Sequence, residues 1–453
     1  MRFQESLDCV AAFSSEGSFE RLRKHLPLEW IEAALKATGT ATIRRRRLPA
    51  EQVIWLVLGM ALFRKFSIVY VVSQLQIALP SVRGAVAASS IPDARARLGY
   101  EPLEYLFSRT AEEWAHASAD RDRWRGLALY GVDGTTIRVP DSPENRSTFG
   151  NTKTGRGNGE SGYPMVRMVA LMALRSHLLA DARFDGCAVA SEIALAKSVW
   201  EHLPNQALAI IDRGFFSADI FSGITEAGRQ RHWLTRVKKS TVWTEIEKCG
   251  PSDALVELNV SGEARRKNPN LPKTFRARAI AYQRPGFPPS TLLTSLLDAK
   301  RYPARELIAL YHERWELELG YDEIKTHLLD REEAIRSKSP DGIRQEIWGI
   351  LLTYNLVRLE MERVADAAKV SPLRISFINA MRSIQCAWIV ASSLDAPGRT
   401  GERLKHLRDD LKQMILPARR PERQFPRAVK IKMSNYPRKR PPTPAKQKPG
   451  GTR

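Results

Sequence analysis

The sequence predicts an α/β fold, and three features of the chain lead to that prediction. Short apolar runs have the length and composition of buried strands, and they occupy residues 127–133, 165–174 and 207–212. A helical pattern over about 191–202 precedes the last of them. The first and last runs both end in a carboxylate, at Asp133 and Asp212. Strands that alternate with helices are typical of α/β domains, whose ligand chemistry gathers at strand ends.

Changes of composition divide the rest of the chain into further segments. We expect a helical domain over 1–118, an α/β core over 119–237 and 291–335, a β-rich insertion over 238–290, a helical region over 336–417 and a tail over 418–453. The run 52–63 is apolar nearly all round, so it predicts a buried helix. The tail is basic and Pro-rich, and such a segment is disordered unless it is bound.

The charge of the chain favours a polyanionic partner. Lys and Arg number 71 against 50 Asp and Glu, which gives a formal net charge of +21 among 453 residues. An excess of this size attracts nucleic acid by steering and by counterion release. Ribosome-associated and membrane-surface proteins share the trait, so charge alone does not name the partner. The run Arg44–Arg47 fits phosphate contact and a solvated charge run equally well.

The cysteines and the apolar runs indicate the compartment. Four cysteines lie far apart and form no Cys-x-x-Cys pair, so we expect neither a zinc site nor a disulfide framework. The longest apolar run, Val53 to Phe63, is too short to cross a bilayer, and the first residues lack a signal-peptide layout. We therefore expect a soluble protein of the reducing cytosol, with no membrane partner.

One stretch, residues 311–329, reads as a helix with chemistry on one face. At roughly 100° per residue, four side chains fall within about 60° of one another: Tyr311, Arg314, Glu318 and Lys325. Glu316 and Glu323 point to the other side. A carboxylate flanked by two cations suits a group that holds a divalent metal while its neighbours bind phosphate. The alternative is a solvated face with spaced ion pairs.

Two aspartates upstream bear on that choice. Asp133, Asp212 and Glu318 are far apart in the sequence, so only the fold can bring them together. Rapid phosphodiester cleavage uses two divalent cations roughly 4 Å apart, and carboxylate oxygens hold Mg²⁺ or Mn²⁺. Each aspartate by itself also fits a turn residue, since Asp is common beside Gly in turns.

Together these residues resemble the insertion-sequence-four family of DDE transposases from bacterial mobile elements. The helix reproduces that family's Tyr-Arg-Glu-Lys signature, Y-x2-R-x3-E-x6-K, at Tyr311, Arg314, Glu318 and Lys325. The segments 133–136 (Asp-Gly-Thr-Thr) and 212–215 (Asp-Arg-Gly-Phe) match its two aspartate motifs. The helical N-terminus and the basic stretch 436–440 are similar too, so the resemblance covers nearly the whole chain.

The resemblance implies a fold, an activity and its partners. It implies an RNase H-like core with a β insertion, an N-terminal domain that binds transposon ends, and cut-and-paste DNA transposition through a hairpin. The partners would be double-stranded DNA, as terminal inverted repeats and target, and a second copy in a synaptic homodimer. Asp133, Asp212 and Glu318 would bind two Mg²⁺ (or Mn²⁺) ions. The protein would act in the bacterial cytoplasm, at the nucleoid.

The same resemblance implies that the other signature residues contact DNA. Tyr311, Arg314 and Lys325 would hold backbone phosphates, and Trp315 matches a Trp usual after the signature Arg. For Trp315, packing on the core side of the helix is the favoured alternative to DNA contact. Relatives stack a Trp on a flipped nucleotide where this chain has Ser290, so we expect Phe287 or Trp243 to substitute, or a different hairpin step.

Two other functions remain open on sequence grounds. A metal-dependent nuclease of the same fold would cut DNA without joining it. A non-catalytic protein would occupy transposon ends without chemistry, although the presence of all three carboxylates argues against this alternative.

Overall fold

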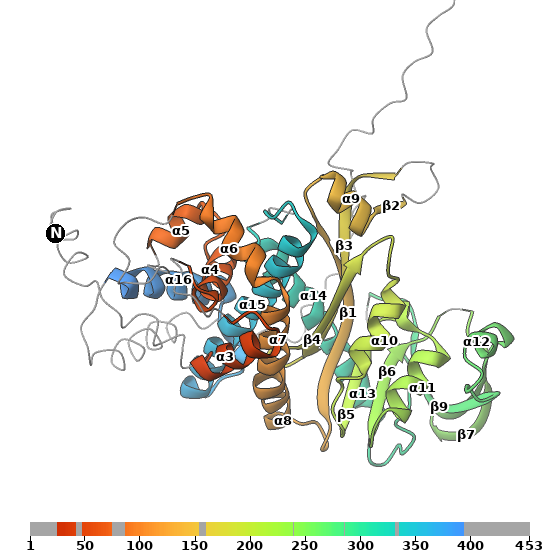
Figure 1. Ribbon diagram of the computed structural model, residues 1–453. Coiled ribbons are helices and arrows are strands. Elements are labelled where there is room, and N and C mark those ends of the chain that lie inside the picture. The colour runs from red at the N-terminus through yellow and green to blue at the C-terminus, as the bar shows by residue number, and fades with distance from the viewer. Residues whose placement is uncertain are drawn as a thin grey trace, which may run out of the picture.

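A mixed ten-stranded sheet with helices on both faces organises the protein (Figure 1). The computed structural model describes residues 25–41, 48–74, 87–153, 160–238, 240–284, 286–330 and 335–393. The strand order is β2-β3-β1-β5-β6-β10-β9-β8-β7, and β4 pairs with β3. The strands are β1 (Ala128–Arg138), β2 (Asn151–Lys153), β3 (Glu160–Ala173), β4 (Leu179–Gly186), β5 (Ala207–Ile211), β6 (Arg231–Arg236), β7 (Thr244–Gly250), β8 (Asp253–Asn259), β9 (Thr274–Tyr282) and β10 (Ser290–Thr294).

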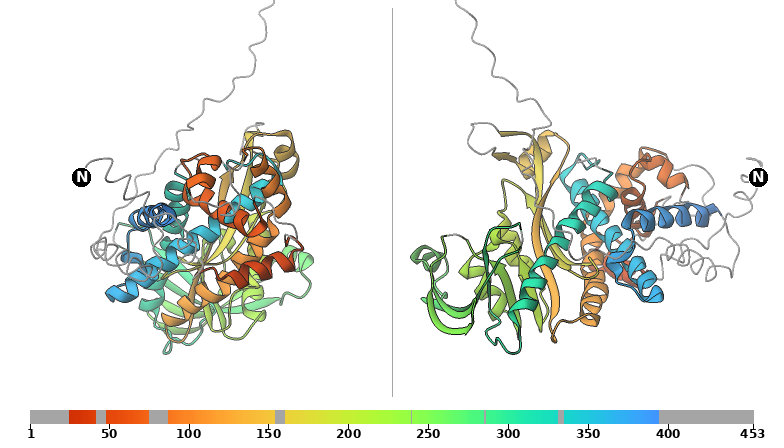
Figure 2. Two further views of the ribbon diagram at one scale, coloured as in Figure 1. Left: turned by 60° about the vertical axis from the view of Figure 1, so that its left-hand side comes forward. Right: turned by 180° about the vertical axis from the view of Figure 1, so that it is seen from behind.

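The centre of the sheet is parallel and buried. Strand β5 pairs in parallel with β1 and with β6, and all five of its residues are buried. The helices α10 (Glu192–Trp200) and α11 (Ala218–Glu226) cover one face, while α13 (Ala304–Glu313) and α14 (Trp315–Asp322) cross the other (Figure 2). Burial on both faces explains why these strands read as continuous apolar runs rather than alternating ones.

Strand β1 is longer than the sequence predicts. The run 127–133 predicts a strand that ends at Asp133, but the strand continues to Arg138. Its pairing with β3 continues to Arg138, whereas its parallel pairing with β5 stops at Val132 and Ile211. Asp133 therefore lies at the end of the parallel ladder, although it is in the middle of its strand.

A bundle of helices packs beside the sheet, on the left in Figure 1. Its helices are α3 (Leu28–Ala37), α4 (Ala50–Leu62), α5 (Ile68–Gln74), α6 (Ser90–Leu98), α7 (Glu101–Thr110), a π-helical turn (Ala111–His116), α8 (Ala117–Arg121), α15 (Pro340–Ala368) and α16 (Phe377–Ser393). Helix α4 is buried along nearly its whole length against α15, as its apolar composition predicts. The N-terminal helices thus share a core with the C-terminal ones.

The polar segment after β1 contains a short helix and a short strand. Residues Pro143–Phe149 form α9, whose first turn is capped by Ser142: its Oγ accepts from the backbone N–H of Asn145. Strand β2 follows directly. The polar composition of this stretch hid the Ser-Pro helix start, which is a recognised capping arrangement.

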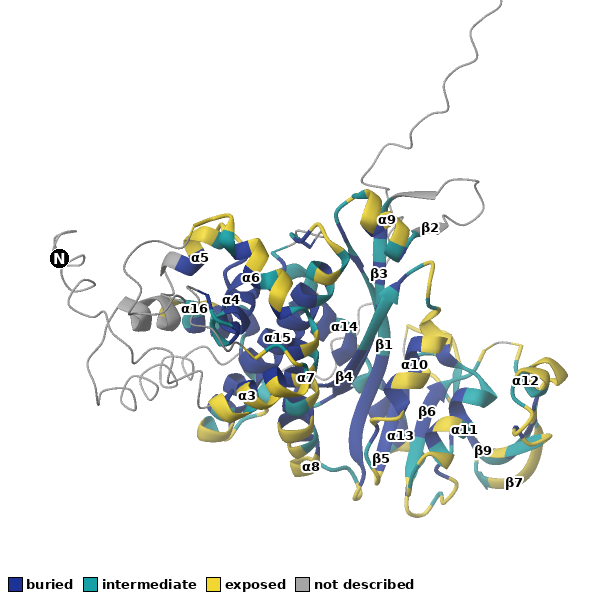
Figure 3. Ribbon diagram, viewed as in Figure 1, coloured by how far each residue is buried: buried dark blue, intermediate teal, exposed yellow. Residues whose placement is uncertain are grey.

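The expected β-rich insertion extends the main sheet. Strands β9, β8 and β7 continue outward from β10, with the short helix α12 (Gly262–Lys267) between β8 and β9. The outermost strand, β7, is largely exposed (Figure 3). It carries Glu245, Glu247 and Lys248, and charged side chains on an edge strand oppose pairing with other chains.

The predicted signature helix is not one regular helix. Helix α13 ends at Glu313, α14 starts at Trp315, and residues Glu323–Leu328 form a π-helical turn, η4. A uniform 100° per residue therefore does not place Lys325. Two short 3₁₀ turns, η3 (Arg213–Phe215) and η5 (Pro372–Arg374), complete the described elements.

Some sequence predictions fall elsewhere in the chain. Arg44–Arg47 and the basic tail lie outside the described residues. Among the helices of the described ranges, none is long and apolar enough to span a membrane.

Candidate active site

Three carboxylates from separate elements surround one guanidinium group, that of Arg314. Its Nη2 lies 3.0 Å from Glu318 Oε1. Its Nε lies 3.8 Å from Asp212 Oδ1, and its Nη1 lies 4.0 Å from Asp133 Oδ2. The structure thus brings Asp133, Asp212 and Glu318 to a common place, although they come from β1, from the residue after β5 and from α14.

Local backbone hydrogen bonds orient the two aspartates. Asp212 follows β5 and caps η3, where its Oδ2 accepts from the N–H of Gly214 at 3.0 Å. Asp133 Oδ1 accepts from the N–H of Gly134 at 2.8 Å. Since the parallel ladder ends one residue before each of them, both side chains emerge at the same edge of the sheet.

Close packing brings the helix to that edge. A Cβ atom on Gly131 of β1 would lie 2.6 Å from Leu317 Cδ1 and 2.7 Å from Leu174 Cδ2, closer than side chains tolerate. A glycine at this position therefore allows α14 to cross β1 at short range, and Glu318 is carried toward Asp133.

The surroundings of Asp133 disfavour its charged form. The pKa of Asp133 is raised to about 6, mainly by burial and further by the charges of Asp212 and Glu192, while the Gly134 N–H and Arg314 act in the opposite direction. A cation placed here would offset both the burial and the repulsion between the acidic groups.

The other two signature residues face the same edge. Tyr311 is buried, and burial raises the pKa of its phenol, with the Asp212 carboxylate adding to the shift and Arg314 opposing it. Lys325 Nζ donates to Thr135 Oγ1 at 3.3 Å, two residues beyond Asp133. The π-helical turn is what presents Lys325 to β1.

Trp315 corrects a sequence expectation. Its side chain is 40% exposed, and the Arg314 guanidinium carbon lies 5.3 Å from its ring centroid. The interpretation as a core-packing aromatic is therefore wrong: the residue takes the outer side of α14, which the spacing of apolar residues alone did not show.

A basic group that the sequence pattern did not mark as a site residue, Arg236, lies beside Asp212. Arg236 follows Thr235, the residue paired with Ile211, so it ends β6 at the edge where Asp212 ends β5. The pKa of His312 falls to about 4 because of burial and of the nearby charges of Arg284, Arg314 and Arg236. Among the described residues, neither His312 Nε2 nor Arg236 Nε has a hydrogen-bond partner.

An aromatic residue was missed as well. Tyr282 stands directly opposite Ser290 in the β9–β10 ladder, and its ring centroid lies 6.1 Å from that of His312. Of the two expected substitutes, Phe287 is 41% exposed and Trp243 packs partly against the core. The run Trp233-Leu234-Thr235 could have marked Arg236 as a strand-end residue, but Tyr282 depends on a register that composition does not reveal.

The donor set is one of oxygens only, which suits a hard divalent cation. Within the described residues, however, no group of three or more His, Cys, Asp or Glu side chains is placed to hold a metal ion. The Arg314 guanidinium occupies the space between the carboxylates, so it must move before a cation can be shared by them.

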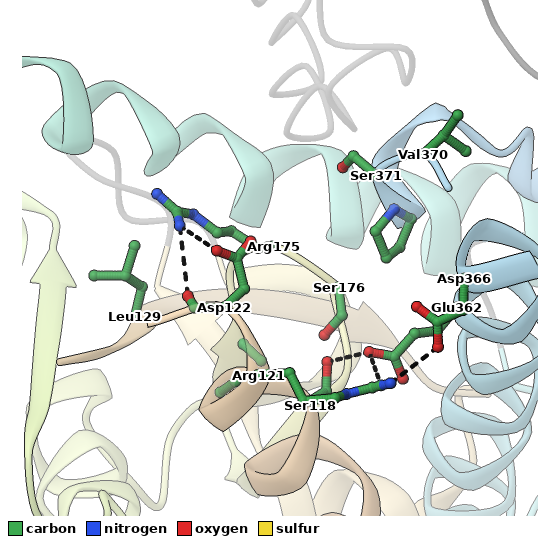
Figure 4. A pocket seen from close by; sticks show the side chains of 13 residues that line it. Ser118, Arg121, Asp122, Leu129, Arg175, Ser176, Glu362, Asp366, Val370 and Ser371 are labelled. Carbon is green, nitrogen blue, oxygen red and sulfur yellow. Dashed lines mark hydrogen bonds and ion pairs between the residues drawn. The ribbon is translucent and has the colours of Figure 1, made fainter. Parts of the chain in front are cut away.

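A polar pocket of about 260 Å³ lies away from this cluster, beside Leu129 at the start of β1 (Figure 4). Its charges are paired within the protein: Arg121 with Glu362 and Asp366, and Arg175 with Asp122. Internally compensated charges leave little to attract a ligand, so the pocket does not compete with the carboxylate cluster as the functional site.

Similarity to known proteins identifies the family of this chain. Residues 16–108 match the family model described as insertion element 4 transposase N-terminal, and residues 125–356 match the transposase DDE domain. The chain is 39% identical over 443 residues to the transposase InsG for insertion sequence element IS4 of Escherichia coli strain K12, covering 96% of this chain and 98% of InsG. The chain belongs to the IS4 family of DDE transposases. It is a transposase, and its family acts with divalent metal ions.

Two further proteins are similar to the transposase. InsZ of Escherichia coli strain K12 is 37% identical over 234 residues, which are 51% of this chain and 75% of InsZ. The cryo-EM structure of the piggyBac transposase synaptic complex with hairpin DNA has a TM-score of 0.39 and 11% identity, covering 92% of this chain and 86% of that one. At that score no conclusion follows from the likeness.

Proposed function

We propose that this transposase performs cut-and-paste transposition by two-metal phosphodiester chemistry, with Asp133, Asp212 and Glu318 as the ligands of two Mg²⁺ or Mn²⁺ ions. The observation that carries the proposal is the convergence of these three carboxylates on Arg314. Two bound ions would activate the attacking water or 3′-hydroxyl and stabilise the leaving oxygen.

The protein's own groups prepare this chemistry. Asp212 is held by its cap to Gly214 and Asp133 by the N–H of Gly134, so both carboxylates are oriented before DNA arrives. Burial, and to a lesser extent the charges of Asp212 and Glu192, raise the pKa of Asp133, so a bound cation would favour its charged form. Arg314 supplies part of that compensation in the free protein and would turn to a DNA phosphate when cations take its place.

The surroundings of the cluster suit a DNA backbone. Arg236 and Arg284 lie beside His312 at the sheet edge, with Tyr311 and Lys325 on the signature segment. Guanidinium groups bind phosphate through paired, charge-assisted hydrogen bonds. A flipped nucleotide could stack on exposed Trp315 or Phe287, or on the partly buried Tyr282.

The wider assembly belongs to the same proposal. The sheet around β1, β5 and β6 would be an RNase H-like core that spans 119–237 and 291–335 and carries 238–290 as its insertion. The helices of 1–118 would bind the terminal inverted repeats, and two copies would pair the transposon ends before attacking target DNA. This work would be done in the bacterial cytoplasm, at the nucleoid.

Removal of single carboxylates tests the chemistry. We expect Asp133→Asn, Asp212→Asn and Glu318→Gln each to lower Mg²⁺-dependent cleavage of the element's own ends by about a thousandfold or more, with end binding retained. Glu201→Gln, at an exposed site after α10, is the matched control and should cleave normally. Cleavage that persists in any of the three variants would remove that residue from the site.

Joining separates transposition from its nearest alternative. With a supercoiled plasmid as target, a transposase yields strand-transfer products, whereas a nuclease leaves only cleaved ends. Cleavage without any joined product would favour the nuclease.

A further inference from the structure

A buried phenol links the signature helix to the first aspartate. Tyr321 lies three residues after Glu318 in α14, and its side chain is buried. Its hydroxyl donates to the backbone carbonyl oxygen of Asp133 at 2.5 Å. The contact joins the helix that bears one metal-site carboxylate to the backbone of the residue that bears another.

The same hydroxyl also meets the neighbouring strand. Ala170 of β3 stands opposite Asp133 in the β1–β3 ladder, and its backbone contributes a hydrogen bond to the Tyr321 oxygen. The hydroxyl is therefore inserted between two paired strands at the level of Asp133. A slide or rotation of α14 would break this contact, because a single atom serves both strands.

The hydroxyl is the donor in this contact, because the carbonyl oxygen of Asp133 can only accept. If the hydroxyl is removed, the partly buried carbonyl oxygen of Asp133 loses this partner, which costs stability at the contact.

We propose that Tyr321 is a positioning residue for the metal site: through its hydroxyl bond to the Asp133 carbonyl, it fixes the distance between the Asp133 and Glu318 carboxylates. The proposal rests on the proposed two-metal function. One helical turn separates Tyr321 from Glu318, so the rigid turn transmits the constraint. Shared metal ligands need placement within about 0.5 Å, which is finer than general packing supplies.

Tyr321→Phe tests the proposal because phenylalanine keeps the ring and removes only the hydroxyl. We expect cleavage of a duplex bearing the element's own ends to slow by about tenfold to a hundredfold, with end binding within about twofold of the original. The Mn²⁺ concentration for half-maximal cleavage should rise. Mn²⁺ binding to the DNA-free protein, followed by electron paramagnetic resonance of the unbound ion, should weaken by about threefold to tenfold.

Tyr130→Phe is the matched control on the same strand. Tyr130 is fully buried in β1, and its hydroxyl bonds His116 Nδ1 at 2.8 Å, away from Asp133. Its loss removes an equivalent buried hydroxyl and should leave both Mn²⁺ binding and cleavage within about twofold of the original. Thermal unfolding is recorded for both variants, and all assays are run well below the lower transition, so that a general loss of stability does not enter the comparison.

The outcomes separate the two proposals. Normal Mn²⁺ binding and normal cleavage in Tyr321→Phe, or equal defects in Tyr130→Phe, would overturn the positioning role. Cleavage that survives in Asp133→Asn would instead remove Asp133 from the proposed metal site, and so overturn the proposed three-carboxylate ligand set, whatever Tyr321→Phe does.

Discussion

The two faces of the signature segment use the same residue types in opposite ways. On the front, Arg314 is set among three carboxylates, and the Glu318 side chain is 35% exposed. On the back, Arg358 of α15 forms an ion pair with Glu323, and His177 Nε2 lies 2.9 Å from Glu316 Oε2. The Tyr354 hydroxyl also donates to Glu323, at 2.9 Å. The charged side chains of the back face are largely buried and paired with one another. The three carboxylates of the front face are partly exposed and share the Arg314 guanidinium.

This difference indicates which face awaits an outside partner. A buried carboxylate that is paired with an arginine gains little from another cation, because the pair already offsets the free-energy cost of its desolvation. A partly exposed group of three acids that share Arg314 gains from a bound cation. The back face therefore holds the helix in place, and the front face is where metal and phosphate would exchange with Arg314.

The largest expected effect on stability comes from disrupting the Glu323–Arg358 ion pair of the back face. Glu323→Gln leaves Arg358 buried without its charge partner, and it should lower the free energy of unfolding by about 3–5 kcal/mol. Glu318→Gln on the front should change it by less than about 1 kcal/mol, since that pair is partly exposed. Urea unfolding of both variants measures the contrast. Equal losses would show that the two faces do not differ as described.

The pH dependence of stability should also differ between the faces. Burial opposes ionisation of Glu323, but the charge of Arg358 and the hydrogen bond with His177 lower its pKa from 4.5 to about 2. Because the folded pKa is the lower one, this stabilisation is present above about pH 4.5 and is lost as the pH falls toward 2. At 1.36 kcal/mol per pKa unit it amounts to about 3 kcal/mol.

Asp133 changes the stability in the opposite direction as the pH rises. Its folded pKa, about 6 against 3.8, is raised, so its contribution to stability is present below about pH 4 and is lost as the pH rises through 6. Unfolding in chelator from pH 2 to 7 checks both signs. Glu323→Gln should flatten the acid limb, and Asp133→Asn should flatten the window between about pH 4 and 6. An unchanged profile in either variant would contradict the corresponding assignment.

The sequence predicts the division of the two faces because helical spacing is local. Tyr311, Arg314 and Glu318 share a side by arithmetic, and Glu316 and Glu323 take the other. The aspartates followed from apolar runs that end in a carboxylate. These features depend on neighbours in the chain, which a single sequence contains.

Features that depend on register or on long-range packing could not be read in the same way. The π-helical turn that presents Lys325, and the continuation of β1 past Asp133, are set by contacts with other elements. The proximity of Arg236 to Asp212 needs the β5–β6 register. The Tyr321 contact needs the height of α14 over β1, which glycine at Gly131 permits.

A smaller effect concerns the exchange of Arg314 for metal on the front face. Removing the guanidinium frees the space between the carboxylates and strengthens their mutual repulsion, so Arg314→Gln should tighten Mn²⁺ binding to the DNA-free protein by about tenfold. Calorimetric titration measures it. Arg305→Gln removes the same charge from an exposed site on α13 and should have little effect. Weaker binding in Arg314→Gln would mean that the arginine orients the carboxylates rather than standing in for a cation.

The smallest effect concerns the phosphate contact at the end of the same face. Lys325→Ala should weaken end binding a few-fold and lower the slope of log affinity against log salt by about one, because one fewer counterion is released. Lys300, exposed in the turn after β10, lies at the other end of that strand from Ser290, so Lys300→Ala is the control and should leave the slope unchanged. A weaker affinity with an unchanged slope would mean that Lys325 acts through its hydrogen bond to Thr135, as part of the frame of the site rather than as a contact to DNA.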